Sequence, residues 1–173
     1  MNASPSAARF NPLAIGLAFA AVLLVADQLS KMWILESVRL PDLGKIEISA
    51  IFDLTYVRNY GVSFGLLRAG SDLERWLLVA LSGGIALLFL NWLRTAPRLS
   101  AALALGAVIG GAIGNMIDRI RFGYVVDFLD FSGLYFPYVF NVADAAITVG
   151  ALGLVADYLI NGEGEAAPKK AVK

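Results

Sequence analysis

Two aspartates in the second half of the chain are candidates for catalysis. Asp127 lies in the sequence YVVDFL, where the nearest basic residue is Arg121, and Asp144 lies in FNVADAAITVG, which has no basic residue. Two carboxyl groups in apolar surroundings would raise each other's pKa if the fold brought them together, and they could then share one proton. An aspartic peptidase uses such a pair, because one carboxylate takes a proton from the attacking water while the protonated partner polarises the scissile carbonyl.

The residue types alone are compatible with further roles for the two aspartates. They could be buried, hydrogen-bonded carboxyls, or they could line an ion path. A small ion-coupled carrier should have polar residues through the full membrane depth and often internal repeats, and the chain shows neither. A purely structural membrane module leaves both aspartates unexplained. Among other peptidases, the GxGD signature of presenilin-like and prepilin-type enzymes is absent, and a dyad of Ser30 and Lys31 is disfavoured because adjacent helical residues point apart.

The composition indicates an integral membrane protein. Of the 173 residues, 58% are hydrophobic and only 16% are charged, whereas soluble domains are about a quarter charged. The 14 basic and 14 acidic residues cancel, so bulk charge gives no reason to expect a nucleic-acid partner. The chain contains no His and no Cys, which excludes disulfides, zinc sites of the usual kind, Cys nucleophiles and Ser-His catalysis.

Four apolar segments are long enough to cross a membrane as helices. The first could instead be a cleaved signal peptide, but its polar end DQLSK and the three later segments favour a retained helix. In the third, Gly106, Gly110 and Gly114 share one helical face, so another helix can pack closely there. The expected spans are residues 12–35, 73–93, 99–120 and 140–160, with an N-terminal segment, 1–11, before them and a disordered tail, 161–173, after them.

Residues 36–72 have a different pattern and are expected to form a small β-rich element outside the membrane. From Lys45 to Tyr56 apolar and polar residues alternate, which is typical of one or two strands with one covered face. Residues 41–44, Pro-Asp-Leu-Gly, have the composition of a turn. We expect a single domain, residues 12–160, with this element on one side of the membrane.

The charges at the span ends predict the orientation. The short link between the second and third spans carries Arg94 and Arg98, which places both termini in the cytoplasm. In that orientation the strongly polar side chains of the spans fall in one layer near the outer face, and Asp157 is the exception. The residues of this layer are Asp27, Asn115, Asp118, Asn141 and Asp144, with Asp127 in the connection between the last two spans.

Most of these polar residues are expected to have a structural role. Asp27 and Lys31 are four positions apart on a helix, with the acid first, so they are expected to form an ion pair. Asp118 and Arg119 are expected to act as a pairing and positioning set. The Asn side chains, which can both donate and accept, are expected to hydrogen-bond neighbouring backbone or carboxylates.

Four sequence blocks lie in order between the expected spans. They are DQLSK at 27–31, NYGVSFG at 59–65, GNMIDRIRFGYVVDF at 114–128 and FNVAD at 140–144. Together they resemble bacterial lipoprotein signal peptidase, or signal peptidase II, over nearly the whole chain from about Ala14 to Ile160. One block alone would be a weak signal, whereas four in register are specific.

The resemblance implies a membrane all-α fold, a four-transmembrane-helix bundle with a small periplasmic β-rich cradle, in the bacterial inner membrane. It implies an aspartyl endopeptidase that cuts prolipoproteins before the diacylglyceryl-modified Cys of the lipobox, near the periplasmic face, with no metal and no organic cofactor. We expect a monomer whose partners are the prolipoprotein signal peptide and membrane lipid. The implied catalytic residues are Asp127 and Asp144, and the implied substrate-binding or supporting residues are Asp27, Lys31, Asn59, Gly61, Asn115, Asp118, Arg119 and Asn141.

Overall fold

The computed structural model describes residues 11–61 and 71–161. The expectations for residues 1–10, for 62–70, which include the end of the NYGVSFG block, and for 162–173 lie outside the described residues. Among the described residues, four helices are long and apolar enough to cross a membrane, which confirms the expected multi-pass bundle. They are α1 (Pro12–Met32, extended by a π-helix over Trp33–Ser37), α3 (Asp72–Leu93), α4 (Leu99–Phe122) and α5 (Val142–Asn161).

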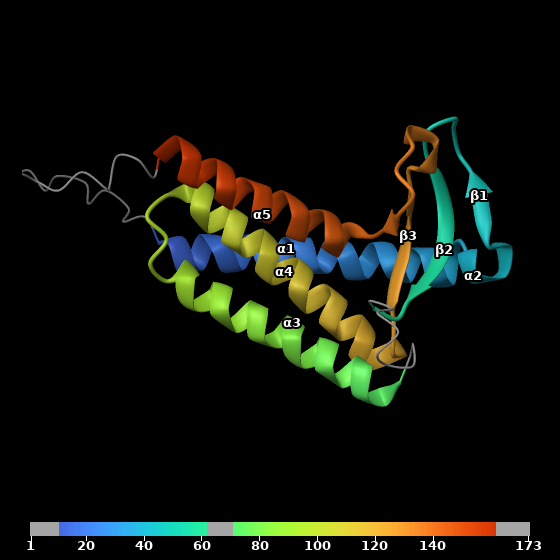
Figure 1. Cartoon of the computed structure of the whole chain (residues 1–173), viewed down its shortest axis with the longest axis horizontal. Helices are drawn as coiled ribbons and strands as arrows, with labels where there is room; N and C mark the ends of the chain where they lie inside the picture. Colours follow the sequence, from blue (N-terminus) through green and yellow to red (C-terminus); the bar gives the residue numbers. More distant parts are fainter. Residues whose placement is uncertain (1–10, 62–70, 162–173) are drawn as a thin grey trace, which may run out of the picture.

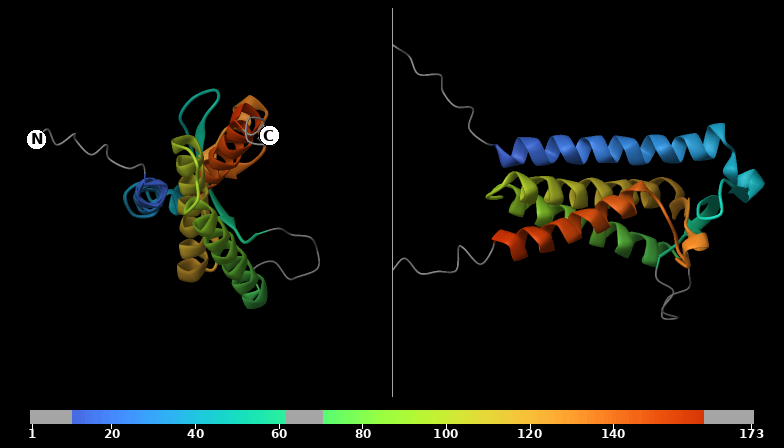
Figure 2. Two further views of the ribbon diagram at one scale, coloured as in Figure 1. Left: turned by 90° about the vertical axis from the view of Figure 1, so that its left-hand side faces the viewer. Right: turned by 90° about the horizontal axis from the view of Figure 1, so that it is seen from above.

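Helix α4 is the centre of the bundle. It packs against α1, α3 and α5, and the view along the bundle shows it between the other three (Figure 2). Within the apolar stretch of α4, 72% of the residues are buried, whereas only 11–17% are buried in those of the other three helices. The exposed faces of these three helices are apolar, as lipid contact requires.

Small residues explain how closely the helices pack on α4. A Cβ atom added at Gly110 would lie 2.6 Å from the Ala20 carbonyl oxygen, and one added at Gly106 would overlap Gly16 of α1. The expected close packing on the glycine face is therefore confirmed, with α1 as the partner. On another side of α4, an added Cβ at Gly150 of α5 would lie 2.7 Å from the Ala104 carbonyl oxygen.

Four short strands form one antiparallel sheet in the order β1-β2-β3-β4. The expected element around residues 36–72 supplies only half of it, since the chain between α4 and α5 supplies the other half. The pairing between β2 and β3 is interrupted by a bulge between Leu54 and Val57. The strands are β1 (Lys45–Glu47), β2 (Asp53–Asn59), β3 (Val125–Asp130) and β4 (Val139–Phe140).

Two local expectations were wrong. Residues 40–43 form a short helix, α2 (Leu40–Leu43), rather than a turn, because Pro41 fits a first helical turn and Gly44 ends it with a positive φ of 75°. Phe140 belongs to β4 rather than to the fourth span, since it pairs with Leu129 across the sheet.

The sheet lies at one end of the bundle. Helix α1 begins and α5 ends at the opposite end, as the side view shows (Figure 1). One face of the sheet packs on the extension of α1 and on α2, where Ile34 and Leu40 respectively cluster with Leu54, Val126 and Phe128. This anchoring fixes β3 directly above the ends of α1 and α4, where the polar residues of the spans gather.

Candidate active site

Asp127 lies in the middle of β3 and is 1% exposed. Two amides hold its carboxyl group: Asn59 Nδ2, from the end of β2, donates to Oδ2 at 3.0 Å, and Asn141 Nδ2 donates to Oδ1 at 2.7 Å. Gly61 orients the first of these amides, because its backbone N–H donates to Asn59 Oδ1 at 3.0 Å with a φ of 113° that favours glycine. The carboxyl group is therefore buried, oriented and without a direct ion-pair partner among the described residues.

Asp144 lies in the first turn of α5, where Asn141 is the N-cap. The Asp144 N–H donates to Asn141 Oδ1 at 2.9 Å, and the Asn141 N–H donates to Asp144 Oδ2 at 3.3 Å. This reciprocal capping box gives both residues a structural role at the helix start. Asn115 of α4 then donates from Nδ2 to Asp144 Oδ1 at 2.7 Å, which fixes the carboxyl group against the centre of the bundle.

Asn141 joins the two carboxyl groups. Its Nδ2 donates to the Asp127 carboxyl group, and its backbone N–H donates to the Asp144 carboxyl group. Its Oδ1 accepts from the Asp144 backbone N–H, and Nδ2 also lies 3.2 Å from Asn115 Oδ1. Burial, and after it the charge of Asp144, raise the pKa of Asp127 to about 7, while the hydrogen bonds from Asn59 and Asn141 act in the opposite direction. A carboxyl group with this pKa carries a proton in a large fraction of molecules at neutral pH.

Arg119 is a cation near both aspartates that their sequence neighbourhoods do not reveal. It lies one turn after Asn115 on α4 and interacts electrostatically with both aspartates, more strongly with Asp144 than with Asp127. Its Nη1 donates to the Asn115 carbonyl oxygen at 3.3 Å, and its buried Nε has no hydrogen-bond partner among the described residues. The sequence around the two carboxyl groups contains no obvious counter-charge, and the structure brings Arg119 near them from helix α4.

The expected pairing of Asp118 with Arg119 was also wrong. Asp118 instead forms an ion pair with Lys31 of α1 at 2.8 Å, and Lys31 simultaneously pairs with Asp27 at 2.9 Å, which confirms the expected pair on α1. All three side chains are almost fully buried. One buried lysine therefore sits between two buried carboxylates and joins α1 to α4.

This buried ion cluster also positions the two elements that carry the candidate catalytic residues. Asp118 accepts a hydrogen bond from the Val126 N–H of β3 at 3.1 Å, and Asp27 accepts one from the Ala143 N–H of α5 at 2.9 Å. Val126 precedes Asp127 in the chain and Ala143 precedes Asp144. The cluster thus fixes the backbone beside each aspartate without touching either carboxyl group.

Gln28 is a site residue that the sequence pattern did not single out. Its Nε2 donates to Asp27 Oδ2 and to Asp118 Oδ1, both at 3.1 Å. The sequence feature that could have identified it is its place in the DQLSK block, between Asp27 and Lys31. Asp157, the expected exception, lies near the far end of α5, where it pairs with Arg98 at 3.6 Å and hydrogen-bonds Ser100.

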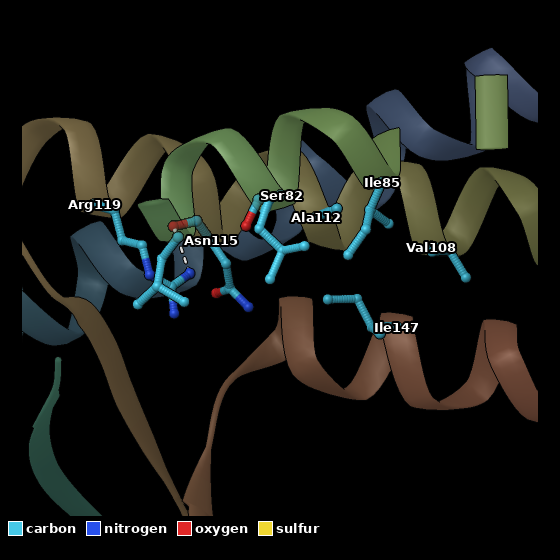
Figure 3. Close-up of a pocket in the computed structure, with 9 residues that line it drawn as sticks. Ser82, Ile85, Val108, Ala112, Asn115, Arg119 and Ile147 are labelled. Carbon is cyan, nitrogen blue, oxygen red and sulfur yellow. Dashed lines mark hydrogen bonds between the residues drawn. The ribbon is translucent and has the colours of Figure 1, made fainter. Parts of the chain in front are cut away.

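Two pockets adjoin the aspartates from different sides. A pocket of about 200 Å³ lies between α3, α4 and α5, and Asn115 and Arg119 point into it together with apolar side chains such as Ile85 and Ile147 (Figure 3). A second pocket of about 400 Å³ lies on the sheet and is lined by residues that include Asp127 and Asn59. The sheet pocket therefore contains Asp127 itself, whereas the pocket between the helices contains Asn115, the hydrogen-bond donor to Asp144.

The arrangement fits acid–base chemistry on a substrate at the edge of the membrane. One buried acid with a raised pKa stands near a second carboxyl group, amides orient both, and a cation offsets their charge. Among the described residues, no group of three or more His, Cys, Asp and Glu side chains could hold a metal ion. All residues that the sequence pointed to for the site lie in this cluster, and their roles stay predictions.

Comparisons with known proteins cover the same part of the chain. The signal peptidase (SPase) II family model matches residues 19–160. The lipoprotein signal peptidase of Rhizorhabdus wittichii is 53% identical over 143 residues, covering 82% of this chain and 83% of that protein. That of Caulobacter vibrioides is 48% identical over 156 residues, covering 86% and 89%. A solved bacterial membrane enzyme superposes with a TM-score of 0.75 at 25% identity, covering 92% of this chain and 95% of that one.

Proposed function

The chain belongs to the signal peptidase II family, and we propose that it is an aspartyl endopeptidase that removes signal peptides from bacterial prolipoproteins. The cut is made before the diacylglyceryl-modified Cys of the lipobox. The observation that carries this proposal is the connection of Asp127 and Asp144 through Asn141, at the junction of the helices and the sheet. Both aspartates are the catalytic residues in this proposal.

The two carboxyl groups divide the acid and base roles. Asp127 carries the proton, because its pKa is raised to about 7 by burial and by Asp144. Asp144 is the base in this proposal, because hydrogen bonds from Asn115 and from the Asn141 N–H hold its carboxyl oxygens in place. Arg119 offsets the negative charge of the pair.

The reaction consumes one water molecule, and each of the two carboxyl groups gives up one proton and takes up one. Asp144 takes a proton from the water while the water oxygen attacks the scissile carbonyl carbon. At the same time, protonated Asp127 donates its proton to the carbonyl oxygen. When the tetrahedral intermediate collapses, the carbon–nitrogen bond breaks and the proton on Asp144 passes to the departing amine. Asp127 recovers its proton from the hydroxyl group that becomes the carbonyl of the new carboxyl end. The products are the signal peptide and a lipoprotein with a free amino group on its Cys.

The place of the site suits a substrate that arrives within the membrane. A signal peptide is an apolar helix and its neighbouring Cys carries lipid, so both approach laterally. The pocket between α3, α4 and α5 is lined mainly by apolar side chains and ends at Asn115 and Arg119, which lead to Asp144. We place both termini in the cytoplasm of the bacterial cell, the sheet at the periplasmic face of the inner membrane, and the working unit as a monomer.

Cleavage of a defined lipopeptide tests the proposal. The purified full chain, in detergent or lipid, is incubated with a lipobox peptide that carries a diacylglyceryl-modified Cys. The masses of the products are then determined by mass spectrometry. We expect one cut, directly before the Cys. No cleavage, or cleavage at another bond, would overturn the proposal. The same peptide with an unmodified Cys shows how much of the recognition depends on the lipid.

A further inference from the structure

The second pocket beside Asp127 has no role in the chemistry described above. Its volume is about 400 Å³, and it is lined by residues at the end of β2 and after it, by Asp127 of β3, and by the segment that leads into β4. These residues are Val57, Arg58, Asn59, Tyr60, Gly61, Asp127, Pro137, Tyr138 and Val139. Every one of them belongs to the sheet or its connections, whereas the first pocket is lined only by residues of α3, α4 and α5.

The two pockets are linked through the hydrogen bonds of the candidate catalytic pair. Asn115 lines the membrane pocket and donates to Asp144, Asp144 is joined to Asp127 by Asn141, and Asp127 lines the sheet pocket. A peptide whose scissile bond lies at this pair therefore has one pocket on each side of the bond. The proposed substrate has the same asymmetry, because the part before the cut is a membrane segment and the part that follows the lipid-modified Cys is water-soluble.

We infer that the sheet pocket is the subsite for the first residues of the mature lipoprotein, those that follow the lipid-modified Cys. The inference rests on the proposed function. Its lining suits a short peptide, since Val57, Pro137 and Val139 offer apolar contacts while Arg58, Asn59 and Asp127 offer polar groups to the peptide backbone. Binding there holds the peptide that follows the Cys next to the catalytic pair, so the subsite contributes to positioning of the scissile bond.

Tyr138 is the specificity-determining residue of this subsite. Its side chain is 69% exposed, so most of its surface is available to contact a bound peptide. The wall that presents it is nevertheless fixed: the ring contacts Phe136 with centroids 5.6 Å apart, Pro137 restricts the backbone, and Val139 pairs with Asp130. A rigid aromatic side chain gives contact area at a low entropic cost.

Two lipopeptides that differ only after the cut test the inference. Both carry the same signal sequence and diacylglyceryl-Cys, but one ends at the Cys as an amide and the other continues for three uncharged residues. The readout is the ratio of kcat/KM for the long peptide to that for the short peptide. In the wild type we expect a ratio of roughly three to ten, which corresponds to the free energy of one aromatic contact. The ratio should be near one in Tyr138→Ala and should keep the wild-type value in Tyr138→Phe.

Tyr135→Ala is the matched control, because Tyr135 is 98% exposed on the same connection but does not line the pocket. It should keep the wild-type ratio. A general folding defect lowers both rates and leaves the ratio unchanged, so the ratio reports the subsite alone. A wild-type ratio of one, or an unchanged ratio in Tyr138→Ala, would overturn the inference while cleavage of the short peptide still supports the proposed function. Failure of the wild type to cut either peptide would count against the proposed function itself.

Discussion

Asn141 Nδ2 donates a hydrogen bond of 2.7 Å to Asp127 Oδ1, and thereby ties the cap of a membrane helix to the middle of a sheet strand. The same side chain caps α5 by accepting from the Asp144 N–H. The start of α5 and the position of β3 are therefore set by one residue. Any movement between the helix bundle and the sheet changes the distance between the two carboxyl groups, so the packing of the whole fold bears on the chemistry.

Replacement of either candidate catalytic aspartate should abolish cleavage. Asp127→Asn and Asp144→Asn each remove one carboxyl group but keep similar volume, and we expect the cleavage rate to fall by at least about a hundredfold, because a positioned acid or base contributes this much. The measurement is product formation from the lipopeptide by purified variants. Asp72→Asn is the control, since that side chain is 91% exposed at the start of α3 and should keep full activity.

Correct folding of the two variants must be shown separately, because Asp144 also takes part in the capping box of α5. Thermal unfolding and gel-filtration profiles in detergent provide this. Retained cleavage in a well-folded Asp127→Asn or Asp144→Asn would show that the residue has no catalytic part.

The raised pKa of Asp127 predicts how stability depends on pH. Its ordinary value is 3.8 and its value in the fold is about 7, so between these pH values the folded protein binds more protons at this residue than the unfolded chain does. The stabilisation by this proton is complete below about pH 4 and is lost as the pH rises through 7. In Asp127→Asn this loss is absent. As the pH rises from 5 to 8, the free energy of unfolding of the variant should therefore increase relative to that of the wild type.

The matched comparison is Asp72→Asn, whose difference from the wild type should not change with pH, because its carboxyl group is exposed. Melting temperatures at several pH values between 5 and 8 provide the measurement. A difference between Asp127→Asn and the wild type that stays constant over this range would mean that Asp127 is ionised throughout. The same proton predicts that kcat/KM decreases as the pH rises above about 7.

The membrane helices were predictable because their signal is local. Each is an apolar run of sufficient length, and the glycine face of α4 follows from a spacing of four residues. Strand β3 was not predicted, because Val125–Asp130 is covered on both faces and so lacks the alternation that indicates a strand. Strand β4 has two residues, which is too short for any pattern.

The candidate catalytic pair was predictable for a similar reason, and its surroundings were not. Asp127 and Asp144 stand out because their sequence neighbours are apolar and uncharged. The cation that acts on them, Arg119, and the partner of Asp118, Lys31, reach them only through the packing of α4 on β3, α5 and α1. Contacts between distant segments leave no trace in local spacing, so the spacing favoured the adjacent pair of Asp118 and Arg119 instead.

Loss of Lys31 should destabilise the protein strongly. Lys31→Met leaves Asp27 and Asp118 as two buried carboxylates without their cation, and removal of one partner from a buried pair costs about 3–5 kcal/mol. The melting temperature in detergent should therefore fall by many degrees. The triple variant Lys31→Met, Asp27→Asn, Asp118→Asn, which removes both stranded charges, should recover part of the loss.

Lys45→Met provides the comparison for this prediction. Lys45 pairs with Asp53 at 2.7 Å, a similar distance, but its side chain is 43% exposed and water can replace the partner. Its loss should change the melting temperature little. Equal decreases of the melting temperature in Lys31→Met and Lys45→Met would mean that burial of the ion cluster does not determine its contribution to stability.

Close packing of α1 on α4 should be required for the active site as well as for the fold. In Gly110→Val, the new side chain meets the Ala20 backbone at 2.6 Å from its carbonyl oxygen, and backbone cannot move aside as a flexible side chain can. Overpacking of this kind typically costs about 1–3 kcal/mol. Because Asp27 and Lys31 lie further along α1, a shift of this helix also displaces the ion cluster that fixes the Val126 and Ala143 backbone, so cleavage should fall together with stability.

Gly84→Val is the matched change on α3, where an added Cβ has no heavy atom within 4 Å. It should leave both the melting temperature and the cleavage rate close to those of the wild type. If Gly110→Val lowered stability but kept the wild-type rate in the folded fraction, the position of α1 would not control the site. If both glycine variants behaved alike, the cost would come from a β-branched residue in a helix rather than from the contact with Ala20. A joint loss confined to Gly110→Val is the result expected if the lysine cluster transmits the helix position to the two aspartates.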